Sequence, residues 1–139
     1  MANDGGLARF QQRMKTIPQA VREAVQPAII KSGDDLVGVM QQLAPKDTGD
    51  LEKSIVATPP GGTTPPYSQP GGSQVVPENT VMVTAGNTDV RYAHLEEYGT
   101  KNAPAQPFFW PAVRLTRKRI TNRIKRSISK AVRDNWGGQ

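Results

Sequence analysis

The sequence predicts an α+β fold, with N-terminal helices, a small antiparallel β-sheet carrying a long Pro/Gly-rich loop, and a basic amphipathic C-terminal helix. Apolar residues recur at three- and four-residue spacing in two long segments, one near each end of the chain. Between these segments, two short β-prone stretches flank a stretch rich in Pro, Gly, Ser and Thr. Because the chain has 139 residues, we expect a single domain over residues 1–139.

The first third of the chain is predicted to be helical. Residues 1–16 are expected to form an N-terminal arm with a short helix, and residues 17–44 a long helix with Pro18 in its first turn, where proline is tolerated. The apolar stripe of the long helix consists of Val21, Ala24, Val25, Ala28, Ile29, Leu36, Val37, Met40 and Leu43. Pro27 removes a backbone hydrogen bond, so we predict a kink or a break near Gln26, and Pro45 ends the helix.

Strands are predicted at 51–58 and 80–85, paired as antiparallel neighbours. The loop between them, 59–79, is predicted to be extended. We favour an arm that reaches a neighbouring subunit; a mobile surface insertion is the alternative, because this composition buries little surface by itself. Residues 90–98 are expected to form one or two helical turns that end at Gly99, since glycine readily adopts the left-handed geometry that closes a helix.

The C-terminal helix, predicted at 111–135, carries most of the positive charge. Residues 111–134 contain nine basic residues and one acid, a net charge of +8 in a chain whose total is +6. One face is apolar and consists of Val113, Ile120, Ile124, Ile128 and Ala131. Candidate contacts to DNA or to an acidic partner occupy the other arc: Arg114, Lys118, Arg119, Arg123, Lys125, Arg126, Lys130 and Arg133. A solvated or subunit-facing surface is the alternative, and Arg117, beside the apolar face, is expected to snorkel or to pair with an acid.

Composition and motifs argue against enzymatic chemistry. The chain has no cysteine, so disulfides and thiolate sites are excluded. His94 is the only histidine, and the adjacent Glu96 and Glu97 point about 100° apart on a helix, so we expect no metal site and no catalytic site there. The sequence lacks a nucleophile-elbow, phosphate-loop or dinucleotide motif. We expect no enzyme activity, no cofactor and, since no apolar run approaches about 20 residues, no membrane span.

Three motifs stand in order along the chain: PKDTGDL at 45–51, YAHLEEYGT at 92–100 and AQPFFWPA at 105–112, followed by the charged helix. Their order and spacing resemble those of the small tail-component family of tailed bacteriophages, over roughly residues 15–135. The residues that match the family pattern are Pro45, Asp47, Thr48, Gly49, Leu51, Tyr92, Ala93, Glu97, Gly99, Thr100, Gln106, Pro107, Phe108, Pro111 and Ala112. His94 matches no fixed position of this pattern.

The resemblance implies a non-enzymatic virion protein of the neck or tail, made in the host cytoplasm, that acts in head-to-tail joining or tail completion. It also implies a homo-oligomeric ring, expected to be a hexamer to suit the symmetry of the tail. The implied partners are head-closure, tail-terminator or tail-tube proteins, and packaged DNA bound non-specifically. The alternative from another class is a basic nucleic-acid-binding protein that acts through its C-terminal helix.

The motif residues also have expected physical roles. Asp47 and Thr48 are expected to satisfy backbone donors in a tight turn before Gly49. Glu97 is expected to pair with an arginine, either of its own chain or of the next subunit. The aromatic residues at 108–110 are expected to bury apolar area where the final helix begins. For the first and third motifs, stabilisation of the monomer alone is an equally supported reading.

Overall fold

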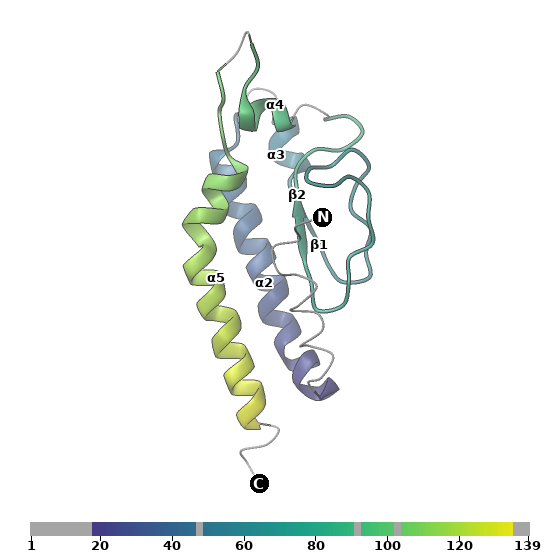
Figure 1. The fold of residues 1–139 in the computed structure, drawn as a ribbon, viewed down its shortest axis with the longest axis vertical. Helices are drawn as coiled ribbons and strands as arrows, with labels where there is room; N and C mark the ends of the chain where they lie inside the picture. Colours follow the sequence, from purple (N-terminus) through teal and green to yellow (C-terminus); the bar gives the residue numbers. More distant parts are fainter. Residues whose placement is uncertain (1–17, 47–48, 91–92, 102–103, 135–139) are drawn as a thin grey trace, which may run out of the picture.

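A computed structural model describes residues 18–46, 49–90, 93–101 and 104–134. Its elements are α2 (Gln19–Leu43), α3 (Asp50–Ser54), β1 (Val56–Thr58), β2 (Met82–Thr84), α4 (Ala93–Tyr98) and α5 (Phe109–Val132). The predicted α+β class is confirmed (Figure 1). The arm and short helix predicted for residues 1–16 lie outside the described residues.

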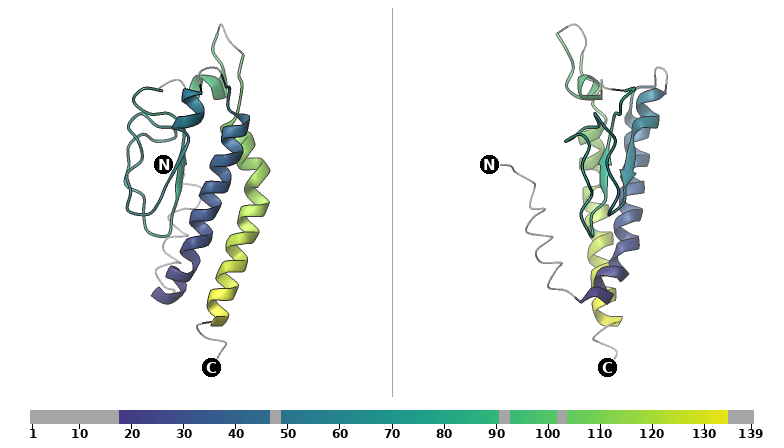
Figure 2. Two further views of the ribbon diagram at one scale, coloured as in Figure 1. Left: turned by 180° about the vertical axis from the view of Figure 1, so that it is seen from behind. Right: turned by 90° about the vertical axis from the view of Figure 1, so that its right-hand side faces the viewer.

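The two long helices, α2 and α5, lie side by side and run in opposite directions (Figures 1 and 2). α2 continues through Pro27 as one helix, and its ribbon changes direction in the first turns (Figure 1). At one end of this pair Val21, Val25 and Ile29 of α2 form a small buried cluster with Ala131 of α5. Within the described ranges, neither helix is long and apolar enough to cross a membrane.

The sheet consists of β1 and β2, which pair antiparallel with Ala57 opposite Val83, and both strands contact α2. Gly33 of α2 is the point of closest approach. A Cβ atom on Gly33 would lie 2.5 Å from Cγ1 of Val81 and 3.3 Å from Cβ of Ala57. Glycine therefore permits a helix-to-sheet spacing that any side chain would widen.

The strand predicted at 51–58 was wrong in its first half, because residues 51–54 belong to α3. Leu51, Ser54 and Ile55 are all buried. Their spacing of three and four residues places them on one face of a helix, whereas a strand would point Leu51 and Ser54 to opposite faces. The second strand, β2, falls inside the range predicted for it.

The segment 59–79 is not the extended arm that its composition suggested. It folds back beside the sheet (Figure 1), where Gln69 and Ala85 exchange both backbone hydrogen bonds, at 2.8 and 3.0 Å. The buried hydroxyl of Thr64 donates to the carbonyl oxygen of Gly72 at 2.7 Å. Hydrogen bonds within the segment thus supply the cohesion that apolar side chains do not. Its contact with a neighbouring subunit stays a prediction.

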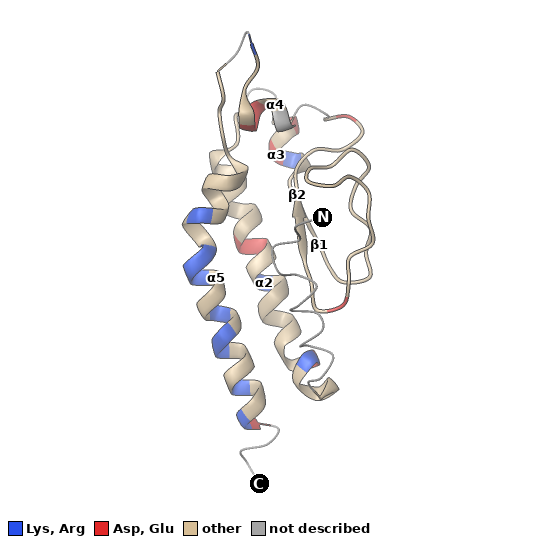
Figure 3. Ribbon diagram, in the orientation of Figure 1, with Lys and Arg blue, Asp and Glu red and all other residues tan. Residues whose placement is uncertain are grey.

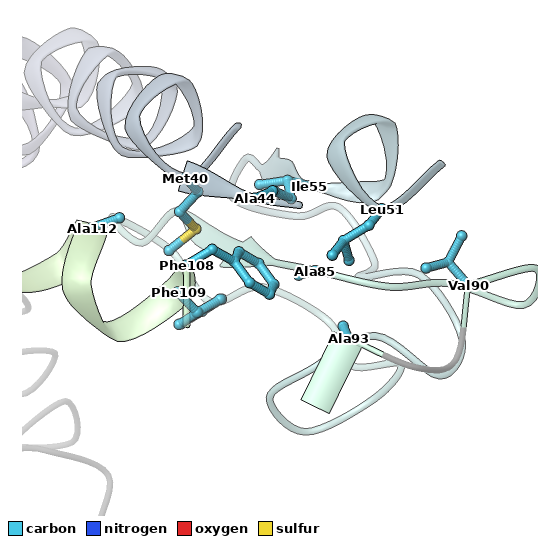
Figure 4. Packing of buried hydrophobic residues seen from close by; sticks show 10 residues of the cluster. All are labelled: Met40, Ala44, Leu51, Ile55, Ala85, Val90, Ala93, Phe108, Phe109 and Ala112. Carbon is cyan, nitrogen blue, oxygen red and sulfur yellow. The ribbon is translucent and has the colours of Figure 1, made fainter. Parts of the chain in front are cut away.

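The largest cluster of buried hydrophobic residues lies where α3, α4, the sheet and the first turn of α5 meet the end of α2 (Figure 4). Its members are Met40, Ala44, Leu51, Ile55, Ala85, Val90, Ala93, Phe108, Phe109 and Ala112. Each of the three motifs contributes to it: Leu51 comes from the first, Ala93 from the second, and Phe108, Phe109 and Ala112 from the third. One role of the motifs is therefore to build a common core.

Candidate interface site

The segment that joins α4 to α5 projects beyond the rest of the molecule (Figure 1). Its described residues, 99–101 and 104–107, are exposed apart from the half-buried Gly99. The outgoing limb carries the end of the second motif, including Thr100, and the returning limb carries Gln106 and Pro107 of the third. Two motifs that are separate in the sequence therefore form the two sides of one exposed loop.

Glu97 fixes the base of this loop. Its Oε1 accepts the backbone N–H groups of Phe108 at 2.9 Å and Phe109 at 2.8 Å, and its Oε2 accepts that of Trp110 at 3.2 Å. The first N–H groups of a helix have no partners within the helix, and a carboxylate there also interacts favourably with the helix dipole. Glu97 therefore caps α5, which begins at Phe109 rather than at the predicted residue 111.

No arginine partner of Glu97 is found among the described residues, and its pairing with an arginine of the next subunit stays a prediction. Glu97 is only 8% exposed, and its carboxylate oxygens accept hydrogen bonds from the main chain. A capping carboxylate cannot be recognised from the pattern of charged residues, because its partners are backbone N–H groups, which every residue except proline has. The one available signal was position, since Glu97 lies in the short helix just before the loop that leads to α5.

Two backbone contacts close the base of the loop further. Gly99 ends α4, as predicted: its φ is +78°, and its N–H donates to the carbonyl oxygen of Leu95 at 2.7 Å. Across the loop, the N–H of Gln106 donates to the carbonyl oxygen of Glu96 at 2.7 Å. The outgoing and returning limbs are thus held together where they leave the body of the protein.

The aromatic residues of the third motif divide between core and surface. Phe108 is 1% exposed and packs edge-on against Phe109, so the predicted burial is confirmed for these two rings. Trp110 is 41% exposed, and its indole N–H donates to the hydroxyl of Tyr98, itself 69% exposed, at 2.8 Å. A pocket of about 60 Å³ lies beside this pair, with Pro70 in its wall. Trp110 and Tyr98 therefore offer apolar surface at the foot of the loop.

The first motif forms the connection from α2 to α3. Pro45 follows the end of α2, Gly49 has a φ of +82° immediately before α3, and Leu51 is buried in the core. Asp47 and Thr48 lie outside the described residues, so their role in the turn stays a prediction. Because Leu51 is part of the common core, this connection has a structural role.

The remaining sequence-predicted residues are placed as follows. Pro111 is half-buried in the first turn of α5, and Ala93 is part of the core. Tyr92 and the side chain of His94 lie outside the described part of the structure. Among the described residues, no three His, Cys, Asp or Glu side chains converge in a way that would hold a metal ion.

Asp35 of α2 binds two of the basic residues predicted to face a partner. Its carboxylate accepts hydrogen bonds from Nε and Nη2 of Arg119, at 2.8 and 2.7 Å, and from Nη2 of Arg123 at 3.3 Å. The hydrogen bonds from Arg119 lower the pKa of Asp35 below its ordinary value, and Asp35 in turn raises the pKa of Arg119. Arg119 and Arg123 thus form an ion pair within the chain, and their predicted contact with DNA or an acidic partner stays a prediction.

Asp35 was missed in the sequence, although a signal existed. Arg119 and Arg123 are four residues apart and therefore share a helix face, while Asp34 and Asp35 are adjacent acids in the middle of the other long helix. Two antiparallel helices place these segments opposite each other. Recognising the pair requires that packing to be known first.

Five of the predicted basic contacts remain without an acidic partner among the described residues. We refer to them as the free basic stripe: Arg114, Lys118, Lys125, Arg126 and Arg133 (Figure 3). All five are exposed. Lys130 instead pairs with Asp134 at 3.0 Å, and Arg117, predicted to snorkel or pair, is exposed.

Together, the fold and the site define a small α+β protein in which a capped helix and a closed loop base display an exposed segment. Over residues 8–99 the chain matches the sequence family described as "Bacteriophage HK97-gp10, putative tail-component", and it belongs to this family. The resemblance to phage tail components is thereby confirmed. The matched region contains the first motif and nearly all of the second and ends before α5. No curated protein and no solved structure matches the chain.

Proposed function

We propose that the protein is a structural subunit of a tailed-phage virion that completes the tail or joins it to the head, and that it assembles as a closed ring, expected to be a hexamer. Membership of a tail-component family supports the virion role. The observation that carries the interface assignment is the exposed loop between α4 and α5. Its base is fixed by Glu97 and by the bond from Gln106 to Glu96. A segment held in place before contact loses less conformational entropy on binding than a free one does.

The surface around the loop suits a contact with another protein. Tyr98 and Trp110 are large aromatic residues that are partly exposed and joined by a hydrogen bond. Aromatic residues of this kind are enriched in the buried centres of protein interfaces. On this proposal the loop and the aromatic pair contact the next subunit or a head-closure, tail-terminator or tail-tube protein.

The substitution Gly99→Val tests the loop directly. At a φ of +78° a β-branched residue is strongly disfavoured, so the outgoing limb would leave α4 in another direction. We expect phage that carry Gly99→Val to yield few or no complete particles, counted by electron microscopy and by plaque titre. The matched control is Gly38→Val, because Gly38 lies in α2 and an added Cβ there meets no atom within 4 Å. Normal particles from the Gly99 variant would remove the loop from the proposal.

The role in the particle is tested by electron microscopy of lysates from a phage with a stop codon in this gene. Full heads separate from tails, or tails of abnormal length or with unfinished ends, would support joining or completion. Intact particles would contradict the proposal. Complementation with the wild-type gene on a plasmid is the control for effects on neighbouring genes.

A second candidate function, that of a nucleic-acid-binding protein acting through α5, is favoured by the free basic stripe. It predicts that the stop-codon phage still joins heads to tails. The same micrographs therefore separate the two candidates.

A further inference from the structure

The free basic stripe extends along most of α5. Arg114 and Arg133 are separated by a rise of about 28 Å, at 1.5 Å per residue. From Phe109 to Arg133 the helix contains no Asp or Glu. The positive charge of this face is therefore not balanced along its own helix, whereas Asp35 offsets one of the two positive charges of Arg119 and Arg123.

The composition of the stripe favours a polyanion over a protein or a lipid surface. Leu115 and Trp110 are the large apolar residues that α5 exposes, so the stripe lacks the apolar centre that stable protein interfaces have. On the apolar face of α5, Ile124 and Ile128 pack against the buried cluster that Ala131 forms with residues of α2. That face is therefore not available to enter a bilayer.

We propose that the free basic stripe is a binding site for the backbone phosphates of duplex DNA, independent of base sequence. Exposed polar side chains between the cations, such as Asn122 and Ser129, are of the type that also donates to phosphate oxygens. This inference deepens the proposed function and rests on it for the source of the DNA, which is the packaged genome at the head-to-tail junction. Arg119 and Arg123 are not part of the proposed site, because both donate hydrogen bonds to Asp35 of α2.

The charge density of DNA fits the length of the stripe. A duplex carries one phosphate charge per about 1.7 Å of its axis, so about 16 charges lie within 28 Å, more than the five cations require. If all five make contacts, the logarithm of the binding constant falls with the logarithm of the salt concentration with a slope of about −4.5. If the protein forms a ring, several stripes can contact one duplex, and the slope becomes steeper in proportion to the number of stripes in contact.

The experiment is a salt titration of the full-length protein with a short mixed-sequence duplex, read by filter binding. The test variant is Lys118→Gln with Lys125→Gln. The matched control is Lys46→Gln with Lys53→Gln, which removes the same charge from residues beside and within α3. We expect the slope to become shallower by about 1.8 in the stripe variant, at about 0.9 for each lost contact, and to stay near the wild-type value in the control.

Equal slopes for the two double variants would overturn the inference, because net charge alone would then explain binding. Absence of DNA binding by the wild-type protein at low salt would overturn it as well. Loss of the ring in the stripe variant, measured by size-exclusion chromatography, with an unchanged DNA slope would assign the stripe to a protein contact instead. Matching thermal unfolding of both variants checks that each is folded.

Failure of this inference is distinguishable from failure of the proposed function. A wild-type slope in the stripe variant removes the DNA site and leaves the joining role in place. Intact particles from the stop-codon phage remove the joining role and leave the measured slope unaffected.

Discussion

Two carboxylates attach α5 to the rest of the protein, and they do so in different ways. Glu97 is buried and accepts three backbone N–H groups, whereas the side chain of Asp35 is 22% exposed and accepts from the side chains of two arginines. If Glu97 is lost, main-chain donors stay buried without partners. If Asp35 is lost, the exposed Arg119 can turn to water and Arg123 keeps its hydrogen bond to the hydroxyl of Ser32. The comparison shows that the partner and the burial of a charge, rather than the charge itself, determine its contribution to stability.

The largest effect is expected for Glu97→Ala. A buried donor that loses its partner costs about 1–3 kcal/mol, and the loss of a helix cap costs about 1 kcal/mol. We therefore expect the free energy of unfolding to fall by about 3 kcal/mol. Urea denaturation followed by circular dichroism measures this change. The variant also tests the loop, because its returning limb enters the capped turn.

Glu96→Ala is the matched control for this substitution. Glu96 is half-buried, and its contribution to the loop base is its backbone carbonyl oxygen, which alanine retains. We expect a change within about 0.5 kcal/mol. A loss as large as that of the Glu97 variant would show that charge near α4, rather than the cap, stabilises the junction.

An intermediate effect is expected for Gly33→Ala. This substitution tests whether the middle of α2 is stabilised more by close packing on the sheet than by the Asp35 ion pair. The new Cβ would overlap Val81 Cγ1, at 2.5 Å, so we expect a loss of about 2 kcal/mol. Gly38→Ala is the control in the same helix, and we expect it to add up to about 1 kcal/mol, because its Cβ meets no neighbour and alanine favours the helix. Thermal unfolding of the pair would contradict this assignment if both variants shifted in the same direction.

The smallest effect is expected for Asp35→Asn. The ion pair is partly exposed, so we expect a loss of about 1 kcal/mol at low salt that shrinks as salt is added. By contrast, the Glu97→Ala loss should not depend on salt to a comparable degree, because that site is buried. Chemical denaturation with urea at two salt concentrations distinguishes the two behaviours.

The same pair gives a pH dependence of defined sign. Hydrogen bonds from Arg119 hold the pKa of Asp35 below its ordinary value of 3.8. A depressed pKa in the folded state means that the stabilisation is fully present above 3.8 and is lost as the pH falls below it through the folded-state pKa. The stability difference between wild type and Asp35→Asn should therefore narrow in that range; a constant difference down to the lowest pH would contradict the ion pair.

The periodic parts of the fold were predictable from the sequence. The apolar stripes of α2 and α5 and the alternation in β2 identified these elements, because each is long or regular enough for its period to appear. Residues 51–54 were misassigned because a single turn of helix is too short to show a period. The compact form of 59–79 was missed because it depends on hydrogen bonds such as that of Thr64, which composition does not report.

The site was predictable to a smaller extent. The three motifs and the family resemblance identified residues that the structure places in the core and at the exposed loop. The order of the motifs along the chain did not show which of these residues contact each other. Glu97 was expected to bind an arginine, whereas it binds main-chain groups of residues 108–110. Arg119 and Arg123 were expected to face a partner, whereas Asp35 holds them. In both cases the missing information was the tertiary proximity of α4, α2 and α5.

The closed base of the exposed loop has a consequence for its length. Because Glu97 and the Gln106–Glu96 bond fix both limbs before they leave the body, residues added between Thr100 and Ala105 extend the loop without moving α4 or α5. Lengthening a loop whose ends are already fixed changes its closure entropy by only about 0.6 kcal/mol per doubling. The loop is thus a place for an epitope tag or a fluorophore, where an insertion changes the proposed contact surface without changing the fold of the body.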